Sequence, residues 1–236
     1  MVPPTLLGVT DPVVLVHGWG GSFRTTWQRS GFTALLEDAG REVIGVDLLG
    51  HGTAPKPHDP EAYADLTERV LAAMPDGRVD AVGFSLGAIT LLRTAVAEPD
   101  RFGKLVLAGI GRNVFERDDT GTERILAGLE GTAPPDDNIA RLFGQYGNQD
   151  GNDVAALAAV LRRPPAEPLD ADRLAAVSCE VLVVVGDRDF VHPADELVDA
   201  LPRATGVVLR NVDHFATPEA FGFIDAALEF LDALPD

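Results

Sequence analysis

A single serine between two glycines is the feature of this sequence that most directly predicts chemistry. The stretch "DAVGFSLGAITLL", Asp80 to Leu92, places Ser85 between Gly83 and Gly87, and the chain of 236 residues has only four serines. Its pattern is typical of a strand, a tight turn and a helix, in which the glycines leave room for a strained turn that exposes the hydroxyl. Ser85 is therefore predicted to be a nucleophile. The alternative is a serine that only caps the helix.

The segments around this serine alternate between short apolar runs and amphipathic stretches. Runs that are apolar on both faces are typical of a buried parallel sheet, which helices cover on both sides. The predicted strands are residues 12–18, 42–47, 79–84, 104–109, 180–186 and 206–210. The predicted helices lie near residues 26–39, 60–74, 86–97, 170–177, 194–201 and 217–233. The fold class is therefore α/β, with a doubly wound, mostly parallel sheet.

Residues 112–169 interrupt this alternation. They separate two predicted strands by far more than an ordinary crossover, and they contain helical pieces such as "ERILAGL", "NIARLFGQY" and "DVAALAAVL". We expect a small helical cap, or lid, inserted into one α/β core that is built from residues 1–111 and 170–236. The alternative is a loosely packed surface excursion.

Composition restricts the partners of the protein and its compartment. Asp and Glu outnumber Lys and Arg by 37 to 19, which gives a net charge of −18, so the surface repels phosphate backbones and anionic lipid headgroups. We therefore expect no nucleic acid and no membrane as partner. The charge is interpreted as a solvated face, with a salt-rich cytosol or steering of cationic substrates as alternatives. Cys179, the single cysteine, cannot form an internal disulfide, and no apolar run reaches membrane-spanning length, so a cytoplasmic location is expected.

Several motifs resemble those of the α/β-hydrolase family, in its branch of small serine hydrolases that includes esterases, thioesterases and carbon–carbon bond hydrolases. They are, in chain order, "VLVHGWGGS", "VIGVDLLGHG", "VGFSLG", "VLVVVGDRDFVHP" and "VDHFATPEAF". Their order along most of the chain carries the resemblance. It implies an oxyanion hole, a Ser-Asp-His triad in that chain order, and no cofactor. Too few residues precede "PVVLVHG" for the family's usual leading pair of antiparallel strands, so a shortened N-terminus is expected.

The resemblance implies that His214 and Asp189 complete the triad with Ser85. A neutral His214 imidazole, in the loop after the last strand, can take the serine proton and return it to the leaving group. The motif "GDRDFV" offers two carboxylates. The family's G-x-x-D pattern selects Asp189 and leaves Asp187 as a turn residue that bonds within its own loop. Asp213, adjacent to His214, is expected to be exposed.

The other four histidines are expected to have different roles. His17 and His51 stand in "HG" turns at strand ends, where a structural, hydrogen-bonded histidine is favoured. His58, in "APKPHDP", is expected to be a loop residue. His192 shares the loop of Asp189 and is predicted to lie at the rim of the substrate pocket, with a part in binding or proton transfer left open.

By the same resemblance, the backbone amides of Trp19 and Leu86 form the oxyanion hole. The cap aromatics Phe143 and Tyr146 are predicted, with His192, to line a mostly apolar substrate pocket, and their alternative role is packing within the cap. The chain has neither an H-E-x-x-H motif nor paired cysteines, and no G-x-G-x-x-G follows a strand. Metal-dependent hydrolysis and dinucleotide binding are therefore disfavoured, and no metal site is predicted.

These features together predict a carboxylesterase-like serine hydrolase that cleaves a small-molecule carboxylic ester through an acyl-enzyme intermediate. One alternative is a thioesterase or carbon–carbon bond hydrolase that uses the same triad. Another is a non-catalytic, ligand-binding relative, because a fold does not by itself imply a function. Epoxide hydrolases and dehalogenases of this fold use a carboxylate nucleophile, and Ser85 argues against them.

Overall fold

The computed structural model describes residues 10–115 and 119–234, which form one parallel sheet with helices on both faces. The sheet has six strands in the order β2-β1-β3-β4-β5-β6, and every neighbouring pair is parallel. The strands are β1 (Val13–Val16), β2 (Val43–Val46), β3 (Val79–Phe84), β4 (Phe102–Ala108), β5 (Glu180–Gly186) and β6 (Ala204–Leu209). The predicted doubly wound α/β class is confirmed, with all six strands within two residues of their predicted starts.

The apolar runs form the centre of the sheet because their side chains are buried on both faces. Every residue of β1 and β3 is buried, whereas the edge strands β2 and β6 are partly exposed. A strand that is apolar on both faces is stabilised most when helices exclude water from both sides. The most apolar runs therefore occupy the middle of the sheet.

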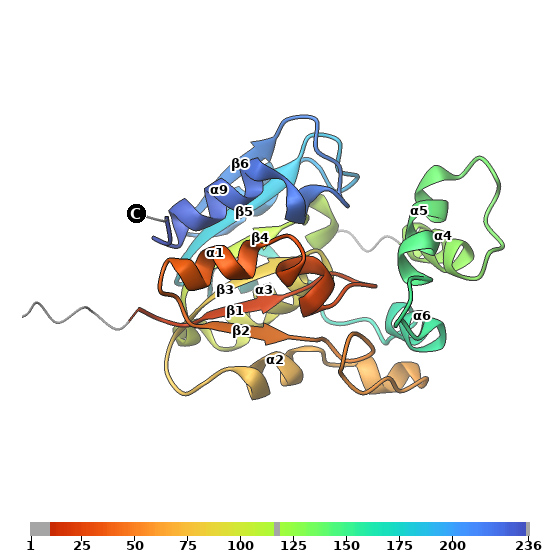
Figure 1. Cartoon of the computed structure of the whole chain (residues 1–236), viewed down its shortest axis with the longest axis horizontal. Coiled ribbons are helices and arrows are strands. Elements are labelled where there is room, and N and C mark those ends of the chain that lie inside the picture. Colours follow the sequence, from red (N-terminus) through yellow and green to blue (C-terminus); the bar gives the residue numbers. More distant parts are fainter. Residues whose placement is uncertain (1–9, 116–118, 235–236) are drawn as a thin grey trace, which may run out of the picture.

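Two groups of helices cover the sheet (Figure 1). On one face lie α1 (Phe32–Asp38) and α9 (Phe221–Phe230), joined by a cluster of the Trp27, Phe32 and Phe223 rings with centroids 5.6 to 6.0 Å apart. On the other lie α2 (Thr67–Ala73), α3 (Leu86–Ala97) and α8 (Asp195–Ala200). The remaining core helices are the short segments η1 (Phe23–Gln28), η2 (Pro60–Tyr63), η3 (Pro99–Arg101), η4 (Arg112–Val114), α7 (Ala171–Leu174) and η5 (Thr217–Glu219).

Three predicted helices are each divided in the structure, and the one predicted over 217–233 becomes η5 and α9. The helix predicted over 26–39 becomes η1 and α1, because Gly31 between them adopts a left-handed φ of 80°. The helix predicted over 60–74 becomes η2 and α2, because the Asp65 carboxylate accepts from the backbone N–H of Thr67 and starts a new helix there. Local caps thus override the apolar periodicity.

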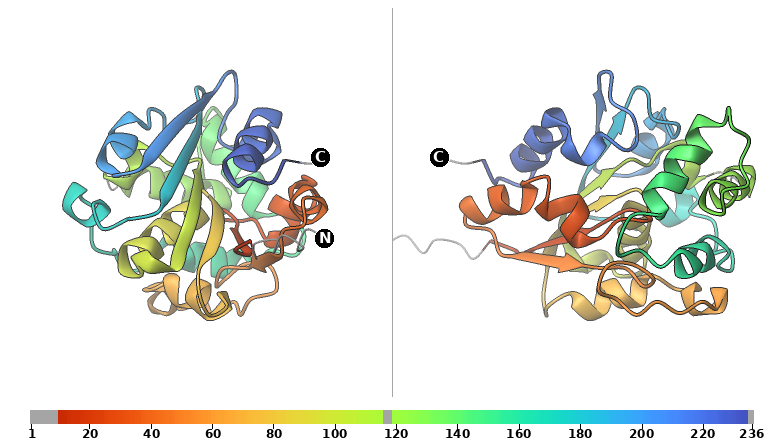
Figure 2. Two further views of the ribbon diagram at one scale, coloured as in Figure 1. Left: turned by 90° about the vertical axis from the view of Figure 1, so that its left-hand side faces the viewer. Right: turned by 45° about the vertical axis from the view of Figure 1, so that its right-hand side comes forward.

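Three helices between β4 and β5 stand at the carboxyl ends of the strands (Figure 2). They are α4 (Asp119–Leu129), α5 (Asn138–Gly147) and α6 (Val154–Leu161). Asp137 and Asp153 cap α5 and α6 by accepting from the N–H groups of Ala140 and Ala156, which satisfies donors that have no partner inside a helix. We call α4 to α6 with their connections the cap.

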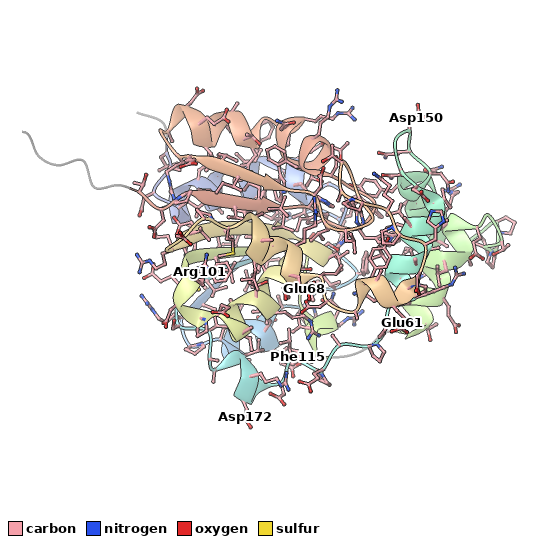
Figure 3. All side chains as sticks on the ribbon, turned by 90° about the horizontal axis from the view of Figure 1, so that it is seen from below. Glu61, Glu68, Arg101, Phe115, Asp150 and Asp172 are labelled. Carbon is pink, nitrogen blue, oxygen red and sulfur yellow. The ribbon has the colours of Figure 1, made fainter. Side chains whose placement is uncertain are left out.

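Side chains fill the space between the cap and the sheet (Figure 3). Asp150, in the α5–α6 connection, lies at the cap end of the molecule, whereas Arg101, just before β4, lies at the opposite end.

Among residues 10–115 and 119–234, no helix combines the length and the apolar character that crossing a membrane requires.

The cap helices α4 and α5 approach each other closely enough for their backbones to touch. A Cβ on Gly128 would lie 1.9 Å from the carbonyl oxygen of Ala140, and a Cβ on Gly144 would lie 2.2 Å from that of Gly128. Both positions therefore require glycine, because the helices would otherwise have to separate.

Gly128→Ala tests this contact through the sign of the stability change. Alanine has a helix propensity about 1 kcal/mol better than glycine, so an unconstrained site would gain stability. We expect a loss of about 1–3 kcal/mol in urea unfolding, together with faster proteolysis within residues 119–161. Glu123→Ala, at an exposed position of the same helix, is the control. Equal or greater stability of Gly128→Ala would show that the helices do not need this approach.

Candidate active site

Ser85 stands at the turn between β3 and α3 in a backbone conformation that residues with side chains rarely adopt. Its φ is 52° and its ψ is −114°. Close packing holds this turn: a Cβ on Gly87 would lie 2.4 Å from the Val16 carbonyl oxygen, and one on Gly83 would lie 2.7 Å from the backbone of Ala88. The first turn of α3 can therefore rest against β1 only if both flanking residues are glycine.

His214 joins Ser85 to a buried carboxylate. The His214 Nε2 atom lies 3.0 Å from Ser85 Oγ, and His214 Nδ1 lies 2.8 and 3.0 Å from the two carboxylate oxygens of Asp189. Asp189 also accepts from the backbone N–H of Val191 at 3.0 Å. His214 and Asp189 are only 4% and 5% exposed. Because the ionised carboxylate can only accept, Nδ1 carries the proton and Nε2 can accept from the serine hydroxyl.

The other two carboxylates near this site face away from His214. Asp213 is exposed, as expected, and accepts from the N–H of Ala216. Asp187 is also exposed, but its carboxylate accepts from the N–H of Asn211 in the loop after β6. The expectation of a bond within its own loop was wrong, because β5 and β6 end side by side and bring the two loops together.

Backbone amides of two segments lie beside the serine. The 18–21 turn closes through a 3.1 Å bond from the N–H of Gly21 to the carbonyl of Gly18. A Cβ on Gly18 would lie 3.2 Å from the Cβ of Ser85, so this turn touches the serine directly. Within residues 10–115 and 119–234, the N–H groups of Trp19 and Leu86 donate to no protein acceptor. Leu86 is the first residue of α3, where a helix attracts negative charge.

Aromatic rings surround His214. The Phe84 and Phe190 rings lie 4.9 and 4.5 Å from its imidazole between centroids, and Phe215 lies 5.7 Å away. The predicted residue Phe143, on α5, is buried among Trp19, Phe190 and Phe215, at 5.9, 5.8 and 4.9 Å. Sequence reasoning missed Phe190, although its position directly after Asp189 is a usable signal. These rings separate the histidine from bulk water on the cap side.

A cavity of about 230 Å³ opens next to Phe84 and Phe215, the neighbours of Ser85 and His214 in sequence. Its lining is more polar than the apolar pocket expected from the sequence: Thr25, Thr26, Arg29, Phe84, Tyr146, Gln149, Phe215, Pro218 and Glu219. Of the three predicted pocket residues, Tyr146 lines this cavity. Phe143 and His192 do not line it, and His192 is half-buried in the loop that follows Asp189.

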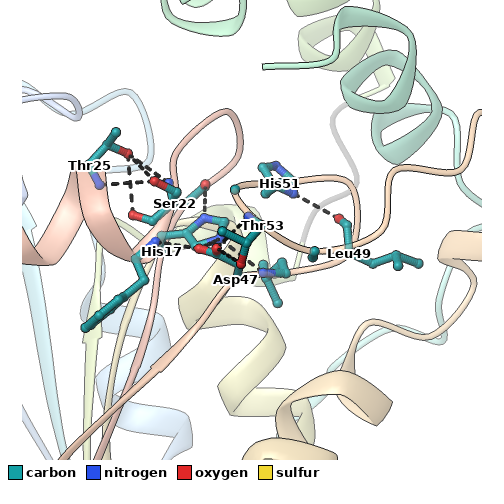
Figure 4. Close-up of polar contacts among 12 residues, drawn as sticks. His17, Ser22, Thr25, Asp47, Leu49, His51 and Thr53 are labelled. Carbon is teal, nitrogen blue, oxygen red and sulfur yellow. Dashed lines mark hydrogen bonds and ion pairs between the residues drawn. The ribbon is translucent and has the colours of Figure 1, made fainter. Parts of the chain in front are cut away.

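Two further histidines, His17 and His51, lie buried with their ring centroids 5.1 Å apart (Figure 4). His17 Nδ1 donates to the carbonyl of Gly18 at 2.7 Å, and its Nε2 accepts from the N–H of Leu48 at 3.1 Å. His51 donates to the carbonyl of Leu49, and its Nε2 has no hydrogen-bond partner in the described part of the chain. The structural role expected for both histidines agrees with these contacts. His58 is exposed and lies 3.0 Å from the Asp153 carboxylate of the cap.

Burial sets the protonation of this histidine pair. It lowers the pKa of His51 to about 3, with the neighbouring His17 adding to the effect, and it also lowers the pKa of His17. Burial alone would raise the pKa of Asp47, but N–H donors from Thr53 and Phe23 outweigh it and hold that pKa below its ordinary value. The histidines are therefore neutral, and Asp47 is ionised, at neutral pH.

A serine on a strand-to-helix elbow, with a histidine and a carboxylate at the carboxyl ends of a parallel sheet, defines the class of α/β hydrolases. The chain belongs to the alpha/beta hydrolase family, whose model matches residues 13–227. Where described, the structure has no group of three or more His, Cys, Asp or Glu side chains placed to hold a metal ion.

Curated relatives include esterases and other hydrolases. The chain is 31% identical over 114 residues to an esterase of Mycobacterium tuberculosis, covering 47% of this chain and 36% of that protein. It is 39% identical over 99 residues to a pimeloyl-[acyl-carrier protein] methyl ester esterase of Neisseria meningitidis, covering 40% and 35%. The chain thus spans about a third of the length of these two relatives. It is 30% identical over 255 residues to a 2-hydroxy-6-oxononadienedioate hydrolase of Burkholderia vietnamiensis, covering 94% and 87%.

Solved structures share the whole fold at low sequence identity. A bromoperoxidase from Bacillus anthracis has a TM-score of 0.73 at 23% identity, covering 95% of this chain and 93% of that one. A 2-hydroxy-6-oxo-6-phenylhexa-2,4-dienoate hydrolase from Rhodococcus sp. strain RHA1 has a TM-score of 0.68 at 22% identity, covering 94% and 90%. At this identity the likeness shows the fold alone.

The neutral histidine pair predicts a loss of stability in acid. An unfolded histidine binds a proton below about pH 6.5, whereas folded His51 stays neutral down to a pKa of about 3. The unfolded state therefore binds more protons in this window, and lowering the pH decreases the free energy of unfolding by up to about 1.4 kcal/mol per pH unit for each such histidine.

His51→Gln should flatten this dependence, as measured by urea unfolding between pH 8 and pH 4. We expect the variant to be less stable than wild type at pH 8, because the glutamine must replace a buried, hydrogen-bonded ring. The gap should narrow as the pH falls. Stability curves that run parallel across the whole range would show that His51 takes up no proton on unfolding.

Proposed function

We propose that the protein is a serine hydrolase that cleaves carboxylic esters through an acyl-enzyme intermediate. The observation that carries this proposal is the continuous hydrogen-bond chain from Ser85 through His214 to Asp189, with distances of 3.0 and 2.8 Å. An acceptor nitrogen within hydrogen-bond reach of a serine hydroxyl is the geometry that general-base activation requires. The buried Asp189 holds the imidazole in the tautomer that this step needs.

The proposed reaction has two halves. Ser85 Oγ attacks the ester carbonyl carbon while its proton passes to His214 Nε2, and the tetrahedral intermediate then expels the alcohol, which takes that proton. A water molecule repeats the sequence on the acyl-enzyme and releases the acid. The amides of Trp19 and Leu86 would donate to the oxyanion in both halves, and such donors typically contribute about 3 kcal/mol each. No cofactor takes part in these steps.

Carbon–carbon bond hydrolysis is the second candidate, and the Burkholderia relative favours it because the match covers 87% of that protein. The compound in its name carries enol, ketone and acid groups but no ester, so its hydrolysis must break a carbon–carbon bond. The methyl ester esterase relative supports ester cleavage, over a shorter match. The polar cavity beside Phe84, with Arg29, Gln149 and Glu219 in its lining, would suit a substrate with polar groups in either case.

We also propose the kind of molecule that the protein binds and the compartment in which it works. A small-molecule ester or thioester would be the substrate, and the net charge of −18 argues against nucleic acid as a partner. A cytoplasmic location fits the single, buried Cys179, because reducing compartments do not select for disulfides. A thioester would react by the same two halves. Hydrolysis of matched ester, thioester and enol-ketone acid substrates by the purified protein would rank the three chemistries.

Ser85→Ala should abolish both ester hydrolysis and covalent labelling by a fluorophosphonate probe, because the attacking oxygen is removed. The circular dichroism spectrum should be unchanged. Residual turnover of about 10³–10⁴-fold over water is the most that the remaining groups can sustain. Stoichiometric labelling of a different serine in this variant would contradict the assignment of Ser85 as the nucleophile. If the wild-type protein also fails to turn over substrate, a non-catalytic, ligand-binding relative would remain as the alternative.

The two aspartates of the 187–189 loop provide a matched pair. Asp189→Asn should lower kcat by about 10⁴-fold, because the amide would favour the wrong histidine tautomer. Asp187→Asn should change kcat by less than about threefold, because that carboxylate bonds only the Asn211 backbone in the described structure. Measurement of kcat for both variants with the same substrate shows which carboxylate supports the reaction. A larger loss of kcat for Asp187→Asn than for Asp189→Asn would assign the role of the triad acid to the exposed Asp187.

A further inference from the structure

The cap binds both central residues of the 18–21 turn. The indole Nε1 of Trp19 donates to the carbonyl of Leu157 at 3.1 Å, and the Asn152 amide nitrogen donates to the carbonyl of Gly20 at 2.9 Å. Asn152 stands just before α6 and Leu157 within it, so one segment of the cap supplies both contacts. The ring of Tyr146, from α5, lies against Gly20, where a Cβ would be 2.9 Å from it.

The Asn152 bond leads to the Trp19 amide through two planar peptide groups. The peptide that carries the Gly20 carbonyl also carries the N–H of Gly21, which donates to the carbonyl of Gly18. The peptide that carries that Gly18 carbonyl also carries the N–H of Trp19. Because a trans peptide is rigid and its C=O and N–H point in opposite directions, fixing the first carbonyl orients the last N–H. Hydrogen bonds in such a chain also strengthen one another.

We propose that Asn152 is a positioning residue that aims the Trp19 N–H at the oxyanion, so that the docked cap completes the oxyanion hole. The inference rests on the serine-hydrolase function proposed above. The core also contacts the peptide that carries the Trp19 N–H, because His17 Nδ1 donates to the Gly18 carbonyl at 2.7 Å. The core thus contacts the Gly18–Trp19 peptide directly, whereas the cap reaches it through the Gly20–Gly21 peptide.

Other contacts attach the cap to the core or hold the cap together without reaching the 18–21 turn, so their removal serves as a control for general damage to the cap. His58 lies 3.0 Å from Asp153, the neighbour of Asn152 in sequence. Asn148 donates to the carbonyls of Leu129 and Gly144, both inside the cap. We expect the loss of either contact to perturb the cap and to leave the bond to Gly20 in place.

Removal of Asn152 should affect the chemical step more than substrate binding. Negative charge develops on the substrate oxygen only in the transition state, so a misaimed donor lowers kcat and leaves KM almost unchanged. A misplacement of about 1 Å costs about 100-fold, and complete loss of one donor costs about 10²–10³-fold. Asn152→Asp is the sharper change, because it keeps the size of the side chain but turns an acceptor toward the Gly20 carbonyl.

The experiment measures hydrolysis of p-nitrophenyl butyrate and the rate of fluorophosphonate labelling by the full chain. Asn152→Ala should lower kcat and the labelling rate by about 10- to 100-fold, with KM within about threefold of wild type, and Asn152→Asp should lose at least as much. The controls Asn148→Ala and His58→Ala should keep kcat within about threefold of wild type. Thermal melting checks that each variant is folded.

Two results would overturn the inference. One is an Asn152→Asp variant with the kcat of wild type, since that would make the donor at this position irrelevant. The other is an equal loss in all four variants, which would assign the effect to attachment of the cap. A wild-type protein that neither hydrolyses the ester nor takes the label would instead overturn the serine-hydrolase proposal, and the positioning role would fall with it.

Discussion

The close approach of α3 to the end of β1 is the constraint on which the candidate site depends. The α-carbon of Gly87 faces the carbonyl oxygens of Val16 and His17 at distances that exclude any side chain. This contact fixes where the helix begins, and Ser85, the residue just before the helix, adopts a positive φ of 52° with a ψ of −114°. It also fixes the end of β1, and therefore the 18–21 turn, relative to the serine. One backbone contact thus sets the spacing between the hydroxyl and the amides that surround it.

The sheet and the cap each supply different groups around Ser85. The sheet supplies the serine, the histidine and the carboxylate, each at the carboxyl end of a strand, where parallel strands direct their loops to a common edge. The cap supplies the ring of Phe143 against His214 and the hydrogen-bond partners of the 18–21 turn. The sheet residues therefore define which reaction is feasible, whereas the cap determines how closely the site is enclosed.

Local rules were sufficient for most of what the sequence predicted. The strands followed from runs of Val, Ile and Leu, and Ser85 followed from a short motif whose geometry is set within a few residues, whereas Asp189 and His214 followed from the resemblance to the family. The structure brings these three side chains together, but their roles stay a prediction that kinetics must test. Helix boundaries were less accurate where one residue decided them, as Gly31 did by adopting a left-handed φ.

Contacts between distant segments could not be predicted in the same way. Asp187 accepts from the N–H of Asn211 only because β5 and β6 are neighbours in the sheet, and Phe190 reaches the His214 ring for the same reason, although its position directly after Asp189 was a local signal. Asn152 meets Gly20 across 132 positions of the chain, and nothing in its surrounding sequence marks it. The polarity of the cavity beside Phe84 is a similar case, since η1, α5 and η5 each contribute to its lining. Such features depend on the complete fold rather than on any one segment.

The separation of 129 positions between Ser85 and His214 has a consequence for the order in which the chain matures. On the ribosome, β1 to β3 and the serine elbow emerge well before the loop that carries the histidine, which follows the edge strand β6. Pairings between such distant segments form late, because the intervening chain must first be ordered. An incompletely synthesised or partly folded chain would thus hold Ser85 without the His214 imidazole, which lies 3.0 Å from the serine hydroxyl once the last strand has joined the sheet.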